Sequence, residues 1–222
     1  LKSRQSRVLF SRDGRTWTPP ARVLHEGEWL WRVTWHDGTA YGVAYGNGVK
    51  RSGDNPAAEW DLALYASRDG LQWEQVAPLA VTGRPNETTL RFQPNGDMVA
   101  LVRREGGNQR GWWGSAPPPY QRWTWTETDH RFGGPNFIRA ADGSWIVCTR
   151  DHTTPPPGAA KGVTTVVARL GEQGRLLPLV TLPSGGDCSY AGLAWHEGQL
   201  WVSYYSSHEG RTGIYLAKLA LP

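Results

Sequence analysis

The chain has 222 residues, of which 39% are hydrophobic and 20% charged, and its formal net charge is +4. This composition is typical of a globular protein, and no apolar run approaches the roughly 20 residues that a membrane-spanning helix needs, so no membrane span is predicted. The small basic excess is spread along the sequence, so it does not indicate a nucleic-acid partner, although it favours an anionic ligand.

The predicted elements are short strands. The sequence contains 27 Gly and 16 Pro, and these residues interrupt long helices. In chain order, apolar blocks of strand length with β-branched or aromatic content are residues 29–35, 40–45, 62–66, 98–102, 145–148, 163–168 and 200–205. Many short strands separated by turn signals leave a sandwich, a barrel or a propeller as candidates.

Two repeats favour the propeller. The segment from Ser11 to Trp17 recurs from Ser67 to Trp73, an offset of 56 residues. A hairpin-turn signal recurs at Asp37, Asn95, Asp142 and Glu197, which lie 58, 47 and 55 residues apart. Such spacing is the period of a four-stranded propeller blade. The sequence therefore predicts an all-β fold, a β-propeller of four-stranded antiparallel blades.

The repeats also predict where the blades lie. We expect a single propeller domain over residues 1–222. It would consist of a partial blade at 1–24 and blades at about 29–78, 86–126, 135–182 and 189–221. This makes 17 strands, or about four and a half blades, with three strands in the last blade. The hairpin that would precede the first repeated segment is absent, so an N-terminal part of the propeller is expected to be missing.

The repeated segment, Ser-x-Asp-Gly-x-x-Trp, resembles the Asp box (BNR repeat) of the sialidase (neuraminidase) superfamily, whose members are six-bladed propellers. The resemblance implies a structural role: the aspartate caps a tight turn between outer strands, the glycine takes a positive φ, and the tryptophan packs between sheets. The residues concerned are Ser11, Asp13, Gly14 and Trp17, and Ser67, Asp69, Gly70 and Trp73.

Polar residues gather at the strand ends opposite the hairpin turns. A propeller brings these ends together around its axis, where they would form a concave, arginine-rich pocket suited to an anionic sugar. The residues are Arg32, Asn86, Glu87, Arg103, Arg104, Asn136, Arg150, Asp151, Tyr190, Tyr204, Tyr205 and His208.

Part of this set is similar to the sialidase site. Asn86-Glu87 followed by Arg103 resembles family segments in which the glutamate polarises a nucleophilic tyrosine and the arginine binds the substrate carboxylate. The segment around Tyr190 resembles the family's tyrosine segment, which implies Tyr190 as nucleophile and Glu87 as its partner. The chain also looks like uncharacterised bacterial sialidase-like proteins at residues 133–138 and 200–210.

Other family positions are less well matched. The first carboxylate-binding arginine and the general-acid aspartate belong to a blade that the chain lacks, and the aspartate that follows the family's tyrosine is Gly192 here. The third arginine position corresponds to Arg150 or to Lys161. Arg32 and Asn136 are further candidate substrate contacts.

The predicted function is that of an exo-α-sialidase-like glycoside hydrolase acting on terminal sialic acid or another acidic sugar. Its partner would be an acidic glycan or sialoside. The two cysteines, Cys148 and Cys188, are expected to be buried thiols, and no second Cys/His pair has zinc spacing, so no metal or other cofactor is expected. The alternatives are a non-catalytic glycan-binding propeller and a protein-interaction propeller.

Overall fold

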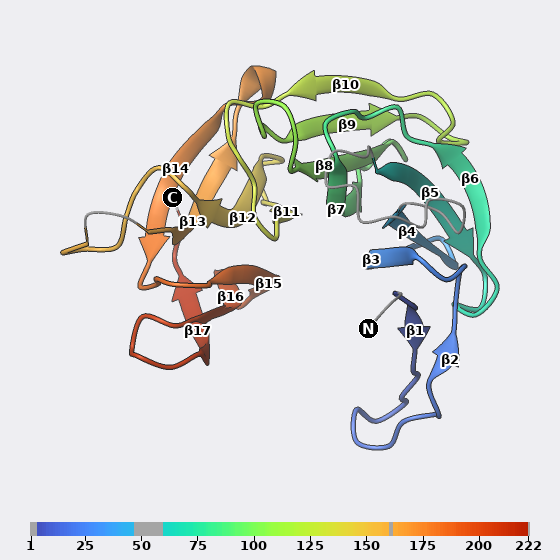
Figure 1. Ribbon diagram of the computed structural model, residues 1–222, viewed down its shortest axis with the longest axis horizontal. Helices are drawn as coiled ribbons and strands as arrows, with labels where there is room; N and C mark the ends of the chain where they lie inside the picture. Colours follow the sequence, from blue (N-terminus) through green and yellow to red (C-terminus); the bar gives the residue numbers. More distant parts are fainter. Residues whose placement is uncertain (1–3, 47–59, 160–161, 222) are drawn as a thin grey trace. The chain divides into compact units, whose positions relative to one another are not determined.

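The structure is a computed structural model that describes residues 4–46, 60–159 and 162–221. These residues form 17 β-strands and one short 3₁₀ turn, η1 (Glu172–Gly174). All strands belong to antiparallel sheets of two to four strands (Figure 1). The prediction of an all-β chain is confirmed. No helix in the described part of the chain is long and apolar enough to cross a membrane.

The N-terminal strands form a two-stranded and a four-stranded sheet. The first contains β1 (Arg7–Val8) and β2 (Ala21–Arg22), and the second contains, in spatial order, β3 (Glu28–His36), β4 (Thr39–Gly46), β5 (Asp61–Ser67) and β6 (Glu74–Pro78). Between β3 and β4, Asp37 and Gly38 have φ values of +46° and +70°. This two-residue turn matches the right-handed twist of the strands, which explains why an Asp-Gly pair marks it in the sequence.

Three further sheets follow along the chain. They contain β7 (Pro85–Phe92), β8 (Met98–Arg104), β9 (Trp112–Ala116) and β10 (Thr124–Glu127); β11 (Asn136–Arg139), β12 (Trp145–Asp151), β13 (Thr164–Leu170) and β14 (Leu176–Leu182); and β15 (Ser189–His196), β16 (Gln199–Ser206) and β17 (Gly213–Leu219). Within each sheet, strands that are consecutive in the sequence lie side by side. The succession of two, four, four, four and three strands agrees with the repeats.

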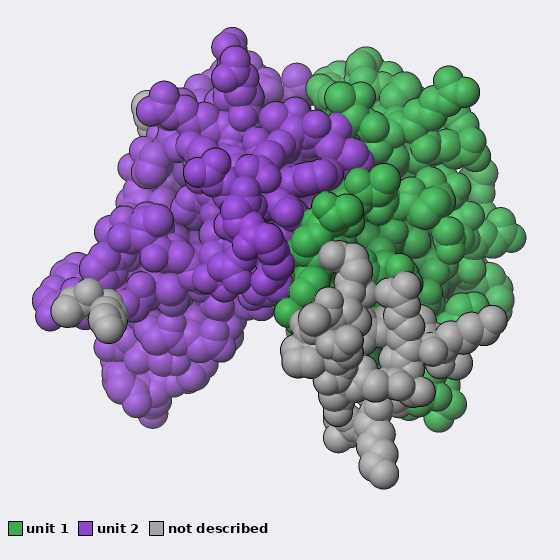
Figure 2. Space-filling view, turned by 45° about the horizontal axis from the view of Figure 1, so that its top comes forward, with its two compact units in different colours: residues 1–99, 115–124 green, residues 100–114, 125–222 purple. Residues whose placement is uncertain are grey.

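The chain divides into two compact units (Figure 2). Unit 1 comprises Leu1–Val99 and Ser115–Thr124, and unit 2 comprises Ala100–Gly114 and Trp125–Pro222. Strands β8, β9 and β10 contain residues of both units. The single domain predicted over residues 1–222 stays a prediction, and each unit is described by itself.

Each unit has its own buried apolar residues. In unit 1, Val43, Leu64 and Leu90 have no exposed surface. In unit 2, one cluster of buried residues contains side chains from two sheets, among them Ile146 on β12 and Val202 on β16. Fully burying side chains of this size contributes about 1.5–3 kcal/mol each. Cys148 and Cys188 are buried thiols in unit 2, as the sequence predicts.

The first segment that resembles an Asp box lies between β1 and β2. Oδ1 of Asp13 accepts the backbone N–H of Thr16 at 2.8 Å, and this hydrogen bond is the main reason that the pKa of Asp13 lies well below its ordinary value. Gly14 has a φ of +70°, and its N–H donates to the hydroxyl of Ser11. Trp17 is 60% exposed, so the predicted packing between sheets is wrong for this residue, because most of its surface faces solvent.

The second segment that resembles an Asp box lies between β5 and β6, the last two strands of their sheet. Oδ1 of Asp69 accepts the backbone N–H of Gln72 at 2.8 Å, and Gly70 has a φ of +75°. The Ser67 hydroxyl accepts the N–H of Gly70 at 2.8 Å. Trp73 is half-buried and donates its indole N–H to the Gly70 carbonyl at 2.9 Å. Both boxes therefore act within their own turns.

Candidate active site

Tyr190 lies near the start of β15, where the backbone is irregular. The pairing of β15 with β16 shifts register between Ser189 and Gly192, and Ser189 and Tyr190 have φ values of +88° and +54°. Residues other than glycine seldom adopt this left-handed region, at a cost of about 1–3 kcal/mol each. Such strain persists only where the surrounding structure holds it, and it concentrates at functional sites.

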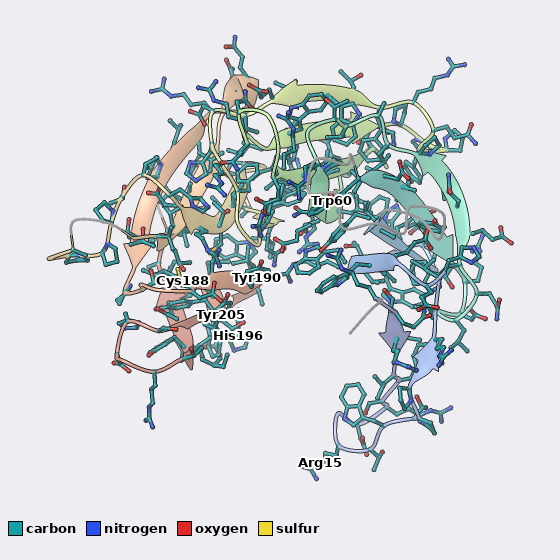
Figure 3. All side chains as sticks on the ribbon, in the orientation of Figure 1. Arg15, Trp60, Cys188, Tyr190, His196 and Tyr205 are labelled. Atoms are coloured by element: carbon teal, nitrogen blue, oxygen red, sulfur yellow. The ribbon has the colours of Figure 1, made fainter. Side chains whose placement is uncertain are left out.

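The ring of Tyr190 is held on several sides within unit 2. A Cβ atom added at Gly134 would lie 2.6 Å from Cγ of Tyr190, so only glycine lets the ring approach this closely. The ring centroid of Tyr205 lies 5.8 Å away, and the figure with all side chains shows these two tyrosines beside each other (Figure 3). The guanidinium carbon of Arg150 lies 5.6 Å from the Tyr190 ring centroid.

The hydroxyl of Tyr190 accepts a hydrogen bond from Arg103. The distance from Nη1 of Arg103 to the tyrosine oxygen is 3.0 Å. A charged donor at this position stabilises negative charge that develops on the phenol oxygen. Arg103 and Tyr190, two of the predicted site residues, are thus in direct contact.

Arg103 also belongs to a charged cluster with Glu105 and Arg131. Nη2 of Arg103 contacts Oε1 of Glu105, and Nη2 of Arg131 lies 3.6 Å from Oε2 of the same carboxylate. His152 lies close to these groups. Its pKa is lowered to about 4, first by burial and then by the positive charges of Arg131, Arg150 and Arg103.

Arg150 is largely engaged by the protein itself. Its Nη2 donates to Asp187 and to the Cys188 carbonyl, each at 2.7 Å, and its Nε donates to the same carbonyl at 3.2 Å. Nη2 also lies 3.4 Å from the Tyr205 hydroxyl. Burial, followed by a hydrogen bond to Asp187, raises the pKa of Tyr205. These contacts fix the segment that leads into β15.

Asn136 has a different role from the predicted substrate contact. Its side chain is 2% exposed, so a ligand does not reach it in this structure. Its amide nitrogen donates to the Ala191 carbonyl at 2.9 Å, and its amide oxygen accepts the Phe137 N–H at 2.9 Å. Asn136 therefore links the start of β11 to the strand that presents Tyr190.

Two further predicted site residues, Glu87 and Arg32, belong to unit 1. Glu87 on β7 is 6% exposed and belongs to unit 1, so its pairing with Tyr190 stays a prediction. Arg32 on β3 also belongs to unit 1, where burial and then the charge of Arg32 lower the pKa of Arg91 to about 10. Lys161 lies outside the described residues.

Sequence reasoning missed Glu105, Arg131 and Asp187. Glu105 directly follows β8, so the strand-end rule that selects Arg103 could have included it. Arg131 lies between β10 and β11, where no strand periodicity marks a functional side chain. Asp187 precedes the buried Cys188, and nothing in the local sequence indicates that it pairs with Arg150 at 2.7 Å.

Several solved structures are similar to this chain. They include a protein of unknown function from Dyadobacter fermentans, with a TM-score of 0.78 at 21% identity, covering 97% of this chain and 64% of the other. A GH32 β-fructofuranosidase from Bombyx mori has a TM-score of 0.63 at 12% identity over 97% of this chain and 53% of the enzyme. An exo-1,5-α-L-arabinanase from a bovine ruminal metagenomic library has a TM-score of 0.60 at 12% identity over 96% and 85%.

These likenesses show the fold. The chain is a β-propeller of antiparallel blades, as predicted. It spans 64% of the length of the Dyadobacter fermentans protein. No protein-family model and no curated protein matches the chain. Membership of the sialidase superfamily therefore stays a prediction, based on the Asp boxes and the residues around Tyr190.

Proposed function

We propose that the chain is a sialidase-like glycoside hydrolase that acts on terminal sialic acid or another acidic sugar, with Tyr190 as its nucleophile. The observation that supports this best is the hydrogen bond of 3.0 Å from Arg103 to the Tyr190 hydroxyl. Two enzymes of similar fold are a β-fructofuranosidase and an arabinanase, so the fold supports action on a glycosidic bond. The arginines around Tyr190 favour an acidic sugar.

A tyrosine suits an acidic substrate because it is neutral until it reacts. A carboxylate nucleophile would be repelled by the carboxylate of the sugar, whereas a phenol is not. In the proposed step Glu87 accepts the phenol proton, and the phenolate oxygen forms a bond to the anomeric carbon. The bond to the leaving oxygen breaks, and an acid protonates that oxygen. Water then releases the sugar from Tyr190.

The arginines have two proposed roles in this reaction. The guanidinium of Arg103 stabilises the charge on the phenol oxygen through its hydrogen bond. Arg150, whose guanidinium carbon lies 5.6 Å from the Tyr190 ring centroid, is proposed to bind the carboxylate of the sugar together with Arg103. Arg32 and Lys161 remain proposed substrate contacts, whereas Asn136 is proposed to position β15.

The test is release of fluorophore from an umbelliferyl α-sialoside. We expect Tyr190→Phe to lower the rate by at least about 10³-fold, because the nucleophilic oxygen is lost. Tyr215→Phe is the matched control, since that hydroxyl donates to Glu209 at 2.9 Å. It should keep the activity of the parent chain.

Two results would contradict the proposal. If Tyr190→Phe is as active as the parent chain, Tyr190 is not the nucleophile. If the folded parent chain hydrolyses no acidic glycoside, the hydrolase assignment falls. Binding of free sialic acid would then separate a glycan-binding propeller from a protein-interaction propeller.

A further inference from the structure

The net positive charge of the chain lies in one N-terminal segment. Residues 4–24 contain five basic residues and one acidic residue, which gives a net charge of +4. This leaves 19 of the 24 basic and 19 of the 20 acidic residues for the rest of the chain, which is therefore neutral. The expectation that the basic excess is spread along the sequence is wrong. The five basic residues are all arginines, namely Arg4, Arg7, Arg12, Arg15 and Arg22.

The second copy of the repeated segment provides an internal comparison. Since the repeat has an offset of 56 residues, residues 60–80 are the counterpart of this basic segment, and they contain one basic and three acidic residues. Arg7 pairs with Arg22 in the first copy. The corresponding residues of the second copy, Ala63 and Pro78, pair in the same register. Because the same hairpin forms without these arginines, the fold does not require them.

The pairing of Arg7 with Arg22 places two like charges opposite each other. Directly paired residues of antiparallel strands point to the same face with their Cβ atoms about 4.5–5.5 Å apart, and like charges in this position are destabilising. Both side chains are exposed, and neither forms an ion pair within residues 4–46, 60–159 and 162–221. An anion that binds both guanidinium groups would remove the repulsion between them.

The other arginines extend this charge along the hairpin. The N–H of Gly27 donates to the Arg4 carbonyl at 2.8 Å, so Arg4 lies at the open end of the hairpin. Arg7 follows about 10 Å further along, at about 3.3 Å per residue of extended chain. Arg12 and Arg15 belong to the loop that joins β1 to β2, and Arg15 extends from this loop (Figure 3). A line of charge suits an extended polyanion better than a single small anion.

The loop also exposes an aromatic ring. Trp17 is 60% exposed, whereas its counterpart in the second copy, Trp73, is half-buried. A flat indole ring presents an apolar surface on which the apolar face of a sugar ring packs. Arginines that bind anionic groups, together with a ring that binds a sugar face, favour an acidic saccharide.

We propose that residues 4–24, the basic hairpin, bind an acidic polysaccharide. The arginines contact the carboxylates of successive sugars, and Trp17 packs on a sugar ring. The hairpin belongs to unit 1, whereas Tyr190 belongs to unit 2, so this binding uses none of the residues around Tyr190. The choice of a polysaccharide over other polyanions rests on the proposed function, because a hydrolase of acidic sugars meets them in chains.

The test is calorimetric titration with polysialic acid, a polymer of N-acetylneuraminic acid, and with neutral dextran as the uncharged polymer. Every protein carries Tyr190→Phe, so that the polymer is not consumed. We expect Arg7→Ala combined with Arg22→Ala to bind polysialic acid about 5–10-fold more weakly, because two charged contacts are lost. Trp17→Ala should bind it about 5-fold more weakly, because the stacking surface is lost. Dextran should bind to none of the proteins.

Arg12→Gln and Arg68→Gln form a matched pair of variants. Both arginines are exposed, and each directly precedes the aspartate of its repeated segment. Arg12→Gln should weaken the binding of polysialic acid about 3-fold, because one charged contact is lost. Arg68→Gln should leave the affinity unchanged, since Arg68 belongs to the copy with an acidic excess. An equal loss in both variants would show a general charge effect and would overturn the inference.

Thermal unfolding distinguishes binding arginines from structural ones. The midpoint of the double variant of Arg7 and Arg22 should be equal to that of the parent chain or higher, because a pair of like charges is removed. A clearly lower midpoint would show that the arginines serve the fold, and the inference would be lost.

The remaining outcomes concern the ligand. If a thymidine oligonucleotide of equal charge binds as tightly as polysialic acid, the hairpin is a nucleic-acid site and the inference is overturned. Polysialic acid that binds as expected, with a Tyr190-containing chain that is inactive toward the umbelliferyl sialoside, would overturn only the proposed function. Activity toward that sialoside without any binding of the polymer would overturn only this inference.

Discussion

Replacement of Gly134 by alanine should destabilise the protein through its contact with Tyr190. The new Cβ would lie 2.6 Å from Cγ and 2.8 Å from both Cδ atoms of the tyrosine ring. A φ of +57° adds a cost of about 1 kcal/mol for any side chain. Overpacking adds about 1–3 kcal/mol, so we expect a total loss of about 2–4 kcal/mol.

Gly210→Ala separates the two contributions. Gly210 also has a positive φ, +82°, but its Cβ would meet no atom within 4 Å, so we expect a loss of only about 1 kcal/mol. Urea unfolding gives the stability of each variant. In a double-mutant cycle, Tyr190→Ala should remove about 1–3 kcal/mol of the cost of Gly134→Ala. An equal loss for both glycine variants, or no coupling to Tyr190, would refute the reasoning.

Two further predictions concern stability. Arg150→Lys should lower the free energy of unfolding by about 1.5–3 kcal/mol, because one ammonium group cannot replace the contacts of Nε and Nη2 with Cys188 and Asp187. An unchanged unfolding midpoint in urea would contradict this prediction. The second prediction concerns Asp69, whose pKa is lowered chiefly by the backbone N–H groups of Gln72 and Leu71. The ionised carboxylate therefore stabilises the folded state at a pH above the unfolded-state pKa of about 3.9. This stabilisation is lost as the pH falls through the lower pKa of the folded state. Asp69→Asn should therefore be less stable than the parent chain at pH 7, but it should lose less stability between about pH 5 and pH 2. The thermal unfolding midpoint of both proteins is measured over this pH range. Parallel pH profiles would show that the Asp69 carboxylate does not stabilise the fold.

The fold was largely predictable because local chemistry marks its turns. Asp37 and Gly38 form the two-residue turn that their residue types favour, and the Asp boxes form hydrogen bonds within a few residues of Asp13 and Asp69. Such signals depend on neighbours in the sequence and repeat with each blade. The number of strands per sheet follows from that period.

The candidate site was less predictable because its contacts join distant segments. The strand-end rule selects both Arg103 and Tyr190, which are 3.0 Å apart in the structure. The same rule also selects Asn136, whose side chain is in fact buried against Ala191. Arg131 lies in a connecting segment, where neither alternation nor a turn signal shows that it faces Glu105.

The left-handed backbone at Ser189 and Tyr190 has a consequence for protein engineering. Glycine tolerates φ values of +88° and +54° better than serine or tyrosine does, so stability-guided design would favour glycine at both positions. At position 190 this change would delete the phenol, and at position 189 it would free the backbone that aims it. Selection of variants for thermal stability alone would thus remove the left-handed backbone and the phenol at the start of β15, and stability would increase at the expense of the proposed activity.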